Sequence, residues 1–172
     1  MGAYGKSDYK VIRVTPTMDA GTAYAANDVL FNSTEIPNAV IGNGGCSKLV
    51  AVFLNNHKDS SFNLDLVFTE KQVNLGTIND AVGSGSLWTE SLAKGAGVIG
   101  FLETEAGDND INLINSQLVK LHADTAHTIG HFPMLLQAAD DSTSVYFSAI
   151  DRTGSIDFGA DDLEFIFHIE YR

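Results

Sequence analysis

Hydrophobic and polar residues alternate at every second position in two segments of the chain. The C-terminal segment 163–171 carries its apolar side chains at Leu163, Phe165, Phe167, Ile169 and Tyr171. Segment 61–69 repeats the pattern at Phe62, Leu64, Leu66 and Phe68. Successive side chains of a strand point to opposite faces, so a two-residue period places each set on one face. Both segments are therefore predicted to be strands with one buried face.

Segment 48–54 is apolar on both faces. This pattern is typical of a strand at the centre of a sheet that is covered on each side, or of a strand at a subunit contact. A turn-like stretch at 57–60 follows, so 47–55 and 61–69 are predicted to form a hairpin. The upstream sequence Asn43-Gly44-Gly45 contains residues that readily adopt positive φ, and it is predicted to reverse the chain into this hairpin.

Shorter strands are predicted along the rest of the chain, at 9–15, 28–31, 98–104, 111–119, 134–137 and 144–151. Clusters of Asp, Asn, Ala and Gly separate them, at the spacing of an antiparallel sandwich. Helical character is confined to 87–94, which Gly95 closes. The predicted fold is all-β, an antiparallel jelly-roll-like β-sandwich with one short helix in a connection.

The length of 172 residues fits one β-sandwich domain over 1–172. A chain of this size buries roughly 70% of its unfolded surface, so its stability needs neither disulfides nor a structural metal. Cys46 is the one cysteine. It lacks a helix N-terminus or a cationic neighbour that would activate its thiol, and it is interpreted as a small buried residue at a strand start.

The net charge of −12 comes mostly from the second half of the chain. Residues 1–86 hold eight acidic and six basic side chains, whereas residues 87–172 hold fourteen acidic and four basic ones. Phosphate contacts need clustered positive charge, so nucleic acid is not an expected partner. No apolar run approaches the roughly 18 residues of a membrane span, and the first residues lack the apolar core of a secretory signal, so no membrane partner is expected either.

Two features raise the question of a metal. The first is a group of three histidines within ten residues, His122, His127 and His131, which would hold zinc only if a specially bent loop brought them together. The acidic clusters are Glu103, Glu105, Asp108 and Asp110, and further on Asp157, Asp161 and Asp162. Neither cluster follows the EF-hand pattern, and both also fit ordinary turn chemistry, so no metal or other cofactor is predicted.

The sequence offers no catalytic constellation, and the protein is predicted not to be an enzyme. Gly83-Ser84-Gly85-Ser86-Leu87 resembles a nucleophile elbow but lacks a buried strand before it. The candidate functional residues are instead interface residues. Trp88 on the predicted helix either caps the sandwich or anchors a partner. Residues 1–8, with Tyr4 and Lys6, are either a frayed end or an extended arm that docks on another subunit.

The chain resembles the small all-β virion proteins of tailed phages, particularly phages of marine bacteria and cyanobacteria, that decorate or cement the capsid. The local patterns that carry the resemblance cover most of the chain and are Val14–Thr17, Asp19–Val29, Asn43–Gly45, Ser91–Lys94 leading into Val98–Phe101, and Gln137–Ile150.

This resemblance implies a non-enzymatic jelly roll that is made in the host cytoplasm and sits on the outside of the virion. It also implies binding to the major capsid protein and a homo-oligomer, with a trimer favoured. The stretch 122–131 with its histidines departs from the simplest members of the family.

Two other functions remain open. A carbohydrate-binding jelly roll, such as a host-attachment knob or fibre head, would use aromatic residues near loops, for which Tyr24, Trp88 and Tyr146 are candidates. A small hydrolase on a β-sandwich would draw on the many carboxylates and histidines, although the sequence singles out no pair of them.

Overall fold

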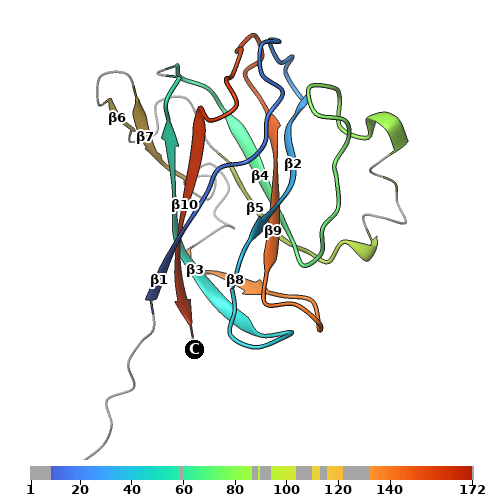
Figure 1. Cartoon of the computed structure of the whole chain (residues 1–172), viewed down its shortest axis with the longest axis vertical. Helices are drawn as coiled ribbons and strands as arrows, with labels where there is room; N and C mark the ends of the chain where they lie inside the picture. The colour runs from blue at the N-terminus through green and yellow to red at the C-terminus, as the bar shows by residue number, and fades with distance from the viewer. Residues whose placement is uncertain are drawn as a thin grey trace, which may run out of the picture.

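The computed structural model describes residues 9–58, 60–86, 89, 94–103, 110–112, 116–121 and 132–171. The fold is all-β, and two antiparallel sheets pack face to face as a sandwich (Figure 1). The strands of the first sheet are β1 (Tyr9–Val14), β3 (Cys46–Asn56), β6 (Asp110–Asn112), β7 (Gln117–Lys120), β8 (Met134–Gln137) and β10 (Leu163–Tyr171). Those of the second sheet are β2 (Val29–Ile36), β4 (Leu64–Thr69), β5 (Val98–Glu103) and β9 (Val145–Asp151).

The strands pair in a nested order. β1 pairs with β10, β2 with β9, β3 with β8, and β4 with β5, and every pair is antiparallel. Rolling such nested pairs into two layers produces the first-sheet order β1-β10-β3 and the second-sheet order β2-β9-β4-β5. This is jelly-roll topology, so the predicted fold class is confirmed.

An extra hairpin interrupts the nesting. β6 pairs with β7, and both lie in the sequence between β5 and β8. β8 covers the N-terminal half of β3 at 46–49, and β7 covers its C-terminal half at 53–56, on the edge of β3 opposite β10. The prediction of a single strand over 111–119 is therefore wrong, because two short strands that pair with each other replace it.

The predicted hairpin of 47–55 and 61–69 is also wrong. Both segments are strands, but β3 belongs to the first sheet and β4 to the second. Each buries its alternating apolar face in the sandwich interior, where Leu54 of β3 and Leu64 of β4 both join the core. The chain crosses between the sheets after β3, and the apolar faces of β3 and β4 then pack toward each other from opposite layers.

The predicted short helix over 87–94 falls mainly outside the described residues, and Ser84–Ser86 forms a 3₁₀ turn just before it. Within the part of the chain that the structure covers, no helix is both long and apolar enough to cross a membrane.

Aromatic rings from both sheets fill the centre of the core. Phe147 of β9 lies with its ring centroid 5.2 Å from Phe165 and 4.9 Å from Phe167, both on β10. Phe31 of β2 contacts Phe147 at 5.2 Å and Phe165 at 5.4 Å. These pairs are edge-to-face, the arrangement that the ring quadrupole favours. The buried face predicted for 163–171 is confirmed from Leu163 to Ile169.

Candidate functional site

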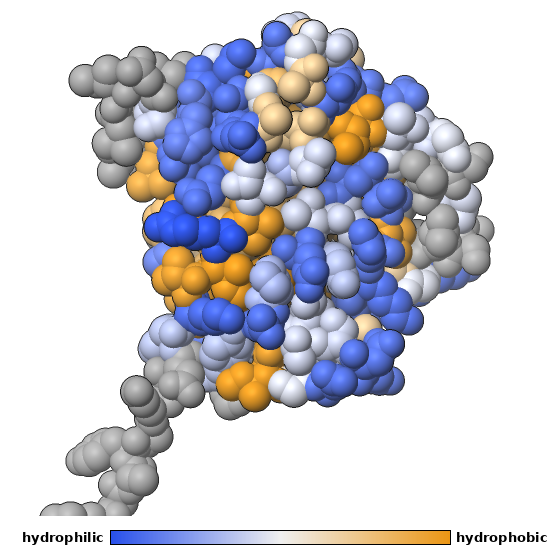
Figure 2. Space-filling model, viewed as in Figure 1, coloured by the Kyte–Doolittle hydropathy of each residue, from blue (hydrophilic) through white to orange (hydrophobic). Residues whose placement is uncertain are grey.

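The outer face of the first sheet carries large apolar side chains. Four of them are exposed: Tyr9 (66%), Val11 (51%), Val50 (37%) and Leu135 (59%). They come from β1, β3 and β8 and point away from the core. Antiparallel sheets usually present polar residues on a solvated face, so this surface departs from the expected pattern. We call it the first-sheet face (Figure 2 shows hydrophobic residues gathered over β1, β10 and β3).

The strand register places apolar side chains of neighbouring strands on this same face. Val11 of β1 lies opposite His168 of β10, and Ile166 of β10 lies opposite Phe53 of β3. The rings of Phe53 and His168 are 5.2 Å apart between centroids. A bulge follows, because His168 pairs with Ala51 and Ile169 pairs with Leu49, which leaves Val50 as the extra residue. Bulges re-aim side chains in this way, and here Val50 is exposed.

The charges on the first-sheet face balance. Lys48 and Glu170 form an ion pair at 3.6 Å at one end, and Arg13 and Glu164 form one at 3.1 Å at the other. Partly exposed pairs of this kind add little to the free energy of unfolding. They do leave this face near neutral on a protein whose net charge is −12.

A second apolar surface lies on β5, the last strand in the order of the second sheet. Phe101 (59%) and Val98 (54%) are exposed there, and Phe101 lies opposite Val67 of β4. At one end of this β5 surface, Asp65 of β4 lies opposite Glu103 of β5. The guanidinium of Arg152 bridges to Asp65 at 2.5 Å.

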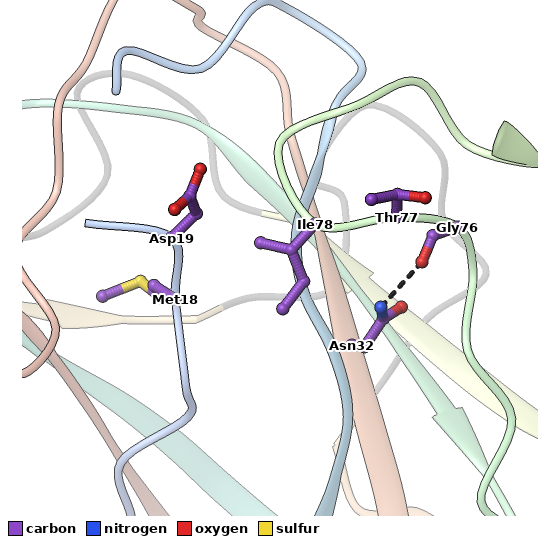
Figure 3. Close-up of a pocket in the computed structure, with 6 residues that line it drawn as sticks. All are labelled: Met18, Asp19, Asn32, Gly76, Thr77 and Ile78. Atoms are coloured by element: carbon purple, nitrogen blue, oxygen red, sulfur yellow. Dashed lines mark hydrogen bonds between the residues drawn. The ribbon is translucent and has the colours of Figure 1, made fainter. Parts of the chain in front are cut away.

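A hollow of about 490 Å³ opens between the segment before β2 and the loop after β4 (Figure 3). Its lining residues are Met18, Asp19, Asn32, Gly76, Thr77 and Ile78. Both polar atoms of the Asn32 amide make hydrogen bonds there, since its Nδ2 donates to the Gly76 carbonyl at 2.7 Å and its Oδ1 accepts from the Leu75 amide at 3.0 Å. Asn32 thus fixes the loop on β2, and we assign the hollow no chemistry.

Another hollow, of about 380 Å³, has a polar lining around Tyr146. It includes Glu70, Gln72 and Asp141. Of the aromatic residues predicted to contact a glycan, Tyr146 is half-buried here, whereas Tyr24 is buried and Trp88 lies outside the described residues.

The remaining predicted site residues fall into two groups. Outside the described residues lie Tyr4, Lys6, Glu105, Asp108, His122, His127 and His131. The second acidic cluster serves turns: Asp157 Oδ1 accepts from the Gly21 amide at 3.1 Å, and Asp162 Oδ2 from the Gly159 amide at 2.5 Å. Among the described residues, no group of three or more His, Cys, Asp or Glu side chains is placed to hold a metal ion.

The interpretation of Cys46 as a small buried residue is wrong. Cys46 is the first residue of β3, and its side chain is exposed beside Lys48 and Leu135 at the margin of the first-sheet face. The alternation of β3 explains this, because Ser47 and Leu49 take the inward positions.

The structure also reveals a buried acid, Asp151, that the sequence analysis did not select. It has no exposed surface, and its carboxylate accepts hydrogen bonds from the Thr153 and Gly154 amides. Burial raises the pKa of Asp151, these amides oppose the rise, and the charge of Asp28 adds to it. Asp151 closes the turn after β9, a structural role.

Comparisons with protein-family models, with curated proteins and with solved structures gave no match to this chain.

Proposed function

We propose that this protein is a non-enzymatic structural protein of a tailed-phage virion. It decorates the outer surface of the capsid by binding the major capsid protein. The observation that supports this function is the exposure of large apolar side chains, Val98 and Phe101, on the outer face of the second sheet of the jelly roll. Contiguous apolar surface on a water-soluble domain is typical of protein–protein contacts.

The β5 surface is the part that we assign to the shell. Phe101 and Val98 provide an apolar centre, and aromatic anchors of this kind dominate protein interfaces. At one end of this surface Asp65 already pairs with Arg152, so we assign recognition of the shell to the apolar centre. A decoration protein needs only such complementary surface, so its function requires no reaction chemistry.

Co-sedimentation with capsids of the encoding phage that lack this protein tests the proposal. The wild-type chain is expected to sediment with the shells, and Phe101→Ser to bind at least tenfold more weakly. Val82→Ser is the control, because Val82 is also exposed but lies off β5. Absence of the protein from purified virions by mass spectrometry would reject the function. Equal binding by the two variants would reject the assigned surface.

The hollow around Tyr146 favours a second candidate function, carbohydrate binding. A tyrosine ring offers an apolar surface to a sugar, while Glu70, Gln72 and Asp141 offer hydrogen-bond partners to its hydroxyls. Glycan arrays with and without a chelator test this candidate, with Tyr146→Ala as the variant that should lose binding. Uniformly blank arrays would count against it.

A further inference from the structure

We propose that the first-sheet face is a contact between two copies of this chain, packed sheet against sheet about a two-fold axis. This inference does not depend on the proposed capsid function, since the surface assigned to the shell lies on the other sheet.

The first step is the position of the apolar side chains. Val11, Ile166 and Phe53 come from three adjacent strands and lie on the same side of the sheet, as their cross-strand register requires, and Ile166 between them is 8% exposed. Val50 joins them at the bulge. Sheets cover such a face by packing against another sheet about 10 Å away. In the single chain the second sheet covers the inner face, and the outer face is left open to a second molecule.

The second step is charge, which favours a second copy of this chain as the occupant. With −12 on each chain, most ways of bringing two copies together place like charges against each other. The first-sheet face avoids this repulsion, because Arg13 and Lys48 offset Glu164 and Glu170 on it. In a two-fold contact each ion pair of one copy meets balanced charge on the other.

The third step is size. Four neighbouring strands about 4.8 Å apart and about six residues long cover roughly 400 Å² of flat surface. Standard interfaces bury about 800 Å² per partner, so this contact is expected to be reversible, with a micromolar dissociation constant. A face that packs on its own copy joins two chains, so we expect a dimer in place of the trimer that the sequence resemblance implied.

Sedimentation velocity and light scattering of the full chain over about 1–200 µM test the contact. The wild type is expected to pass from monomer to dimer, and Val11→Glu to weaken the dimer at least tenfold. Val98→Glu is the matched control: it makes the same change at a strand residue of similar exposure (54% against 51%) on the other sheet, and it should leave the dimer unchanged. If Val11→Glu fails to fold by circular dichroism, Leu135→Glu on β8 replaces it.

The salt dependence of the dimer and a spin label provide two further tests. Raising NaCl should strengthen an apolar dimer of two acidic chains, because it screens their repulsion. A nitroxide on Cys46, the single cysteine, should give a discrete intermolecular distance that Val11→Glu abolishes. The proposal is overturned by a monomer at all concentrations, a trimer, a dimer that salt weakens, or a dimer that Val11→Glu leaves intact. None of these results bears on capsid binding, which the Phe101 variant tests separately.

Discussion

The backbone amide of Gly154 donates a hydrogen bond of 3.0 Å to Oδ2 of Asp151, a carboxylate with no exposed surface at the end of β9. The Thr153 amide donates to the other oxygen, Oδ1, at 2.9 Å. The backbone of Asp151 also joins this turn to the segment before β2, since the Asp151 amide donates to the Asp28 carbonyl and the Asp151 carbonyl accepts from the Asn27 amide. Asp151 therefore organises one end of the sandwich.

Asp151→Asn is expected to destabilise the protein at neutral pH. The amide side chain keeps one acceptor for two backbone donors, so one N–H is left facing another donor, at a cost of about 1–3 kcal/mol. The substitution also removes a titratable carboxyl group. Because burial raises the pKa of Asp151 above its ordinary value of 3.8, the folded state favours the protonated acid. The contribution of Asp151 to the free energy of unfolding is therefore greatest below its ordinary pKa and declines as the pH rises through the raised pKa of the folded state.

Urea unfolding of both proteins between pH 3 and 8 measures this effect. The difference in unfolding free energy, wild type minus variant, should decrease as pH rises from the ordinary carboxyl pKa and level off above the raised one. An Asp151→Asn protein as stable as the wild type at pH 7, or a difference that grows with pH, would contradict this account.

Phe147→Ala is expected to cost about 3–5 kcal/mol of stability, the usual loss for a fully buried ring. Phe147 contacts Phe31, Phe165 and Phe167, so its removal leaves a cavity between the sheets. Phe101→Ala is the matched control on the exposed β5 surface and should change stability by no more than about 0.5 kcal/mol. Denaturant melts of the two variants should therefore differ clearly, and similar losses would show that the core is wrongly placed.

Local alternation was enough to locate β4 and β10, because a two-residue period fixes both the strand and its buried face. It could not supply the partners. Leu54 and Leu64 lie ten residues apart with a turn between them, which fits a hairpin as well as a crossing between layers. The nested pairing of β1 with β10 joins residues more than 150 positions apart, which no local pattern encodes.

The candidate surfaces were predictable only in part. The doubly apolar segment 48–54 indicated a covered strand or a subunit contact, and Val50 on it is exposed. Phe101 and Leu135 gave no such signal, because in a short strand the outward face is known only once the pairing is known. Asp151 looked like any acidic residue at a strand end, since its burial depends on the loops around Asn27 and Gly154.

Gly45→Ala is expected to lower stability by more than about 2 kcal/mol. A Cβ on Gly45 would lie 2.3 Å from the Ile41 carbonyl oxygen and 2.9 Å from that of Gly42, and backbone atoms cannot swing aside. The turn that leads into β3 would have to open. Gly95→Ala is the control, because nothing lies within 4 Å of its Cβ position. Thermal melting should show a fall of roughly 4–8 °C for the first variant and little change for the second, and equal melting temperatures would refute this tight turn.

Tyr24 is expected to keep its proton well above the usual tyrosine range. Burial, the largest cause, raises the pKa of Tyr24 to about 12, and nearby carboxylates of Asp19, Asp151 and Asp157 add to the rise. Its hydroxyl accepts a hydrogen bond from the Asp19 amide at 2.8 Å and donates to the Asp19 carbonyl at 3.2 Å. Since the unfolded chain releases this proton near pH 10, stability should fall as pH rises from about 10 towards 12.

Absorbance titration at the phenolate band, with circular dichroism to follow folding, tests this expectation. In the wild type Tyr24 should be the last of the five tyrosines to ionise, or should ionise only as the chain unfolds, and Tyr24→Phe should remove that last step. Burial also raises the pKa of Tyr171, and Tyr171→Phe should leave the last step in place. Tyr9→Phe is the control, because Tyr9 is exposed on β1 and its loss should leave the late step in place. A last step that survives in Tyr24→Phe and disappears in Tyr171→Phe would mean that Tyr171 is the last tyrosine to ionise, and it would contradict the burial described for the Tyr24 hydroxyl.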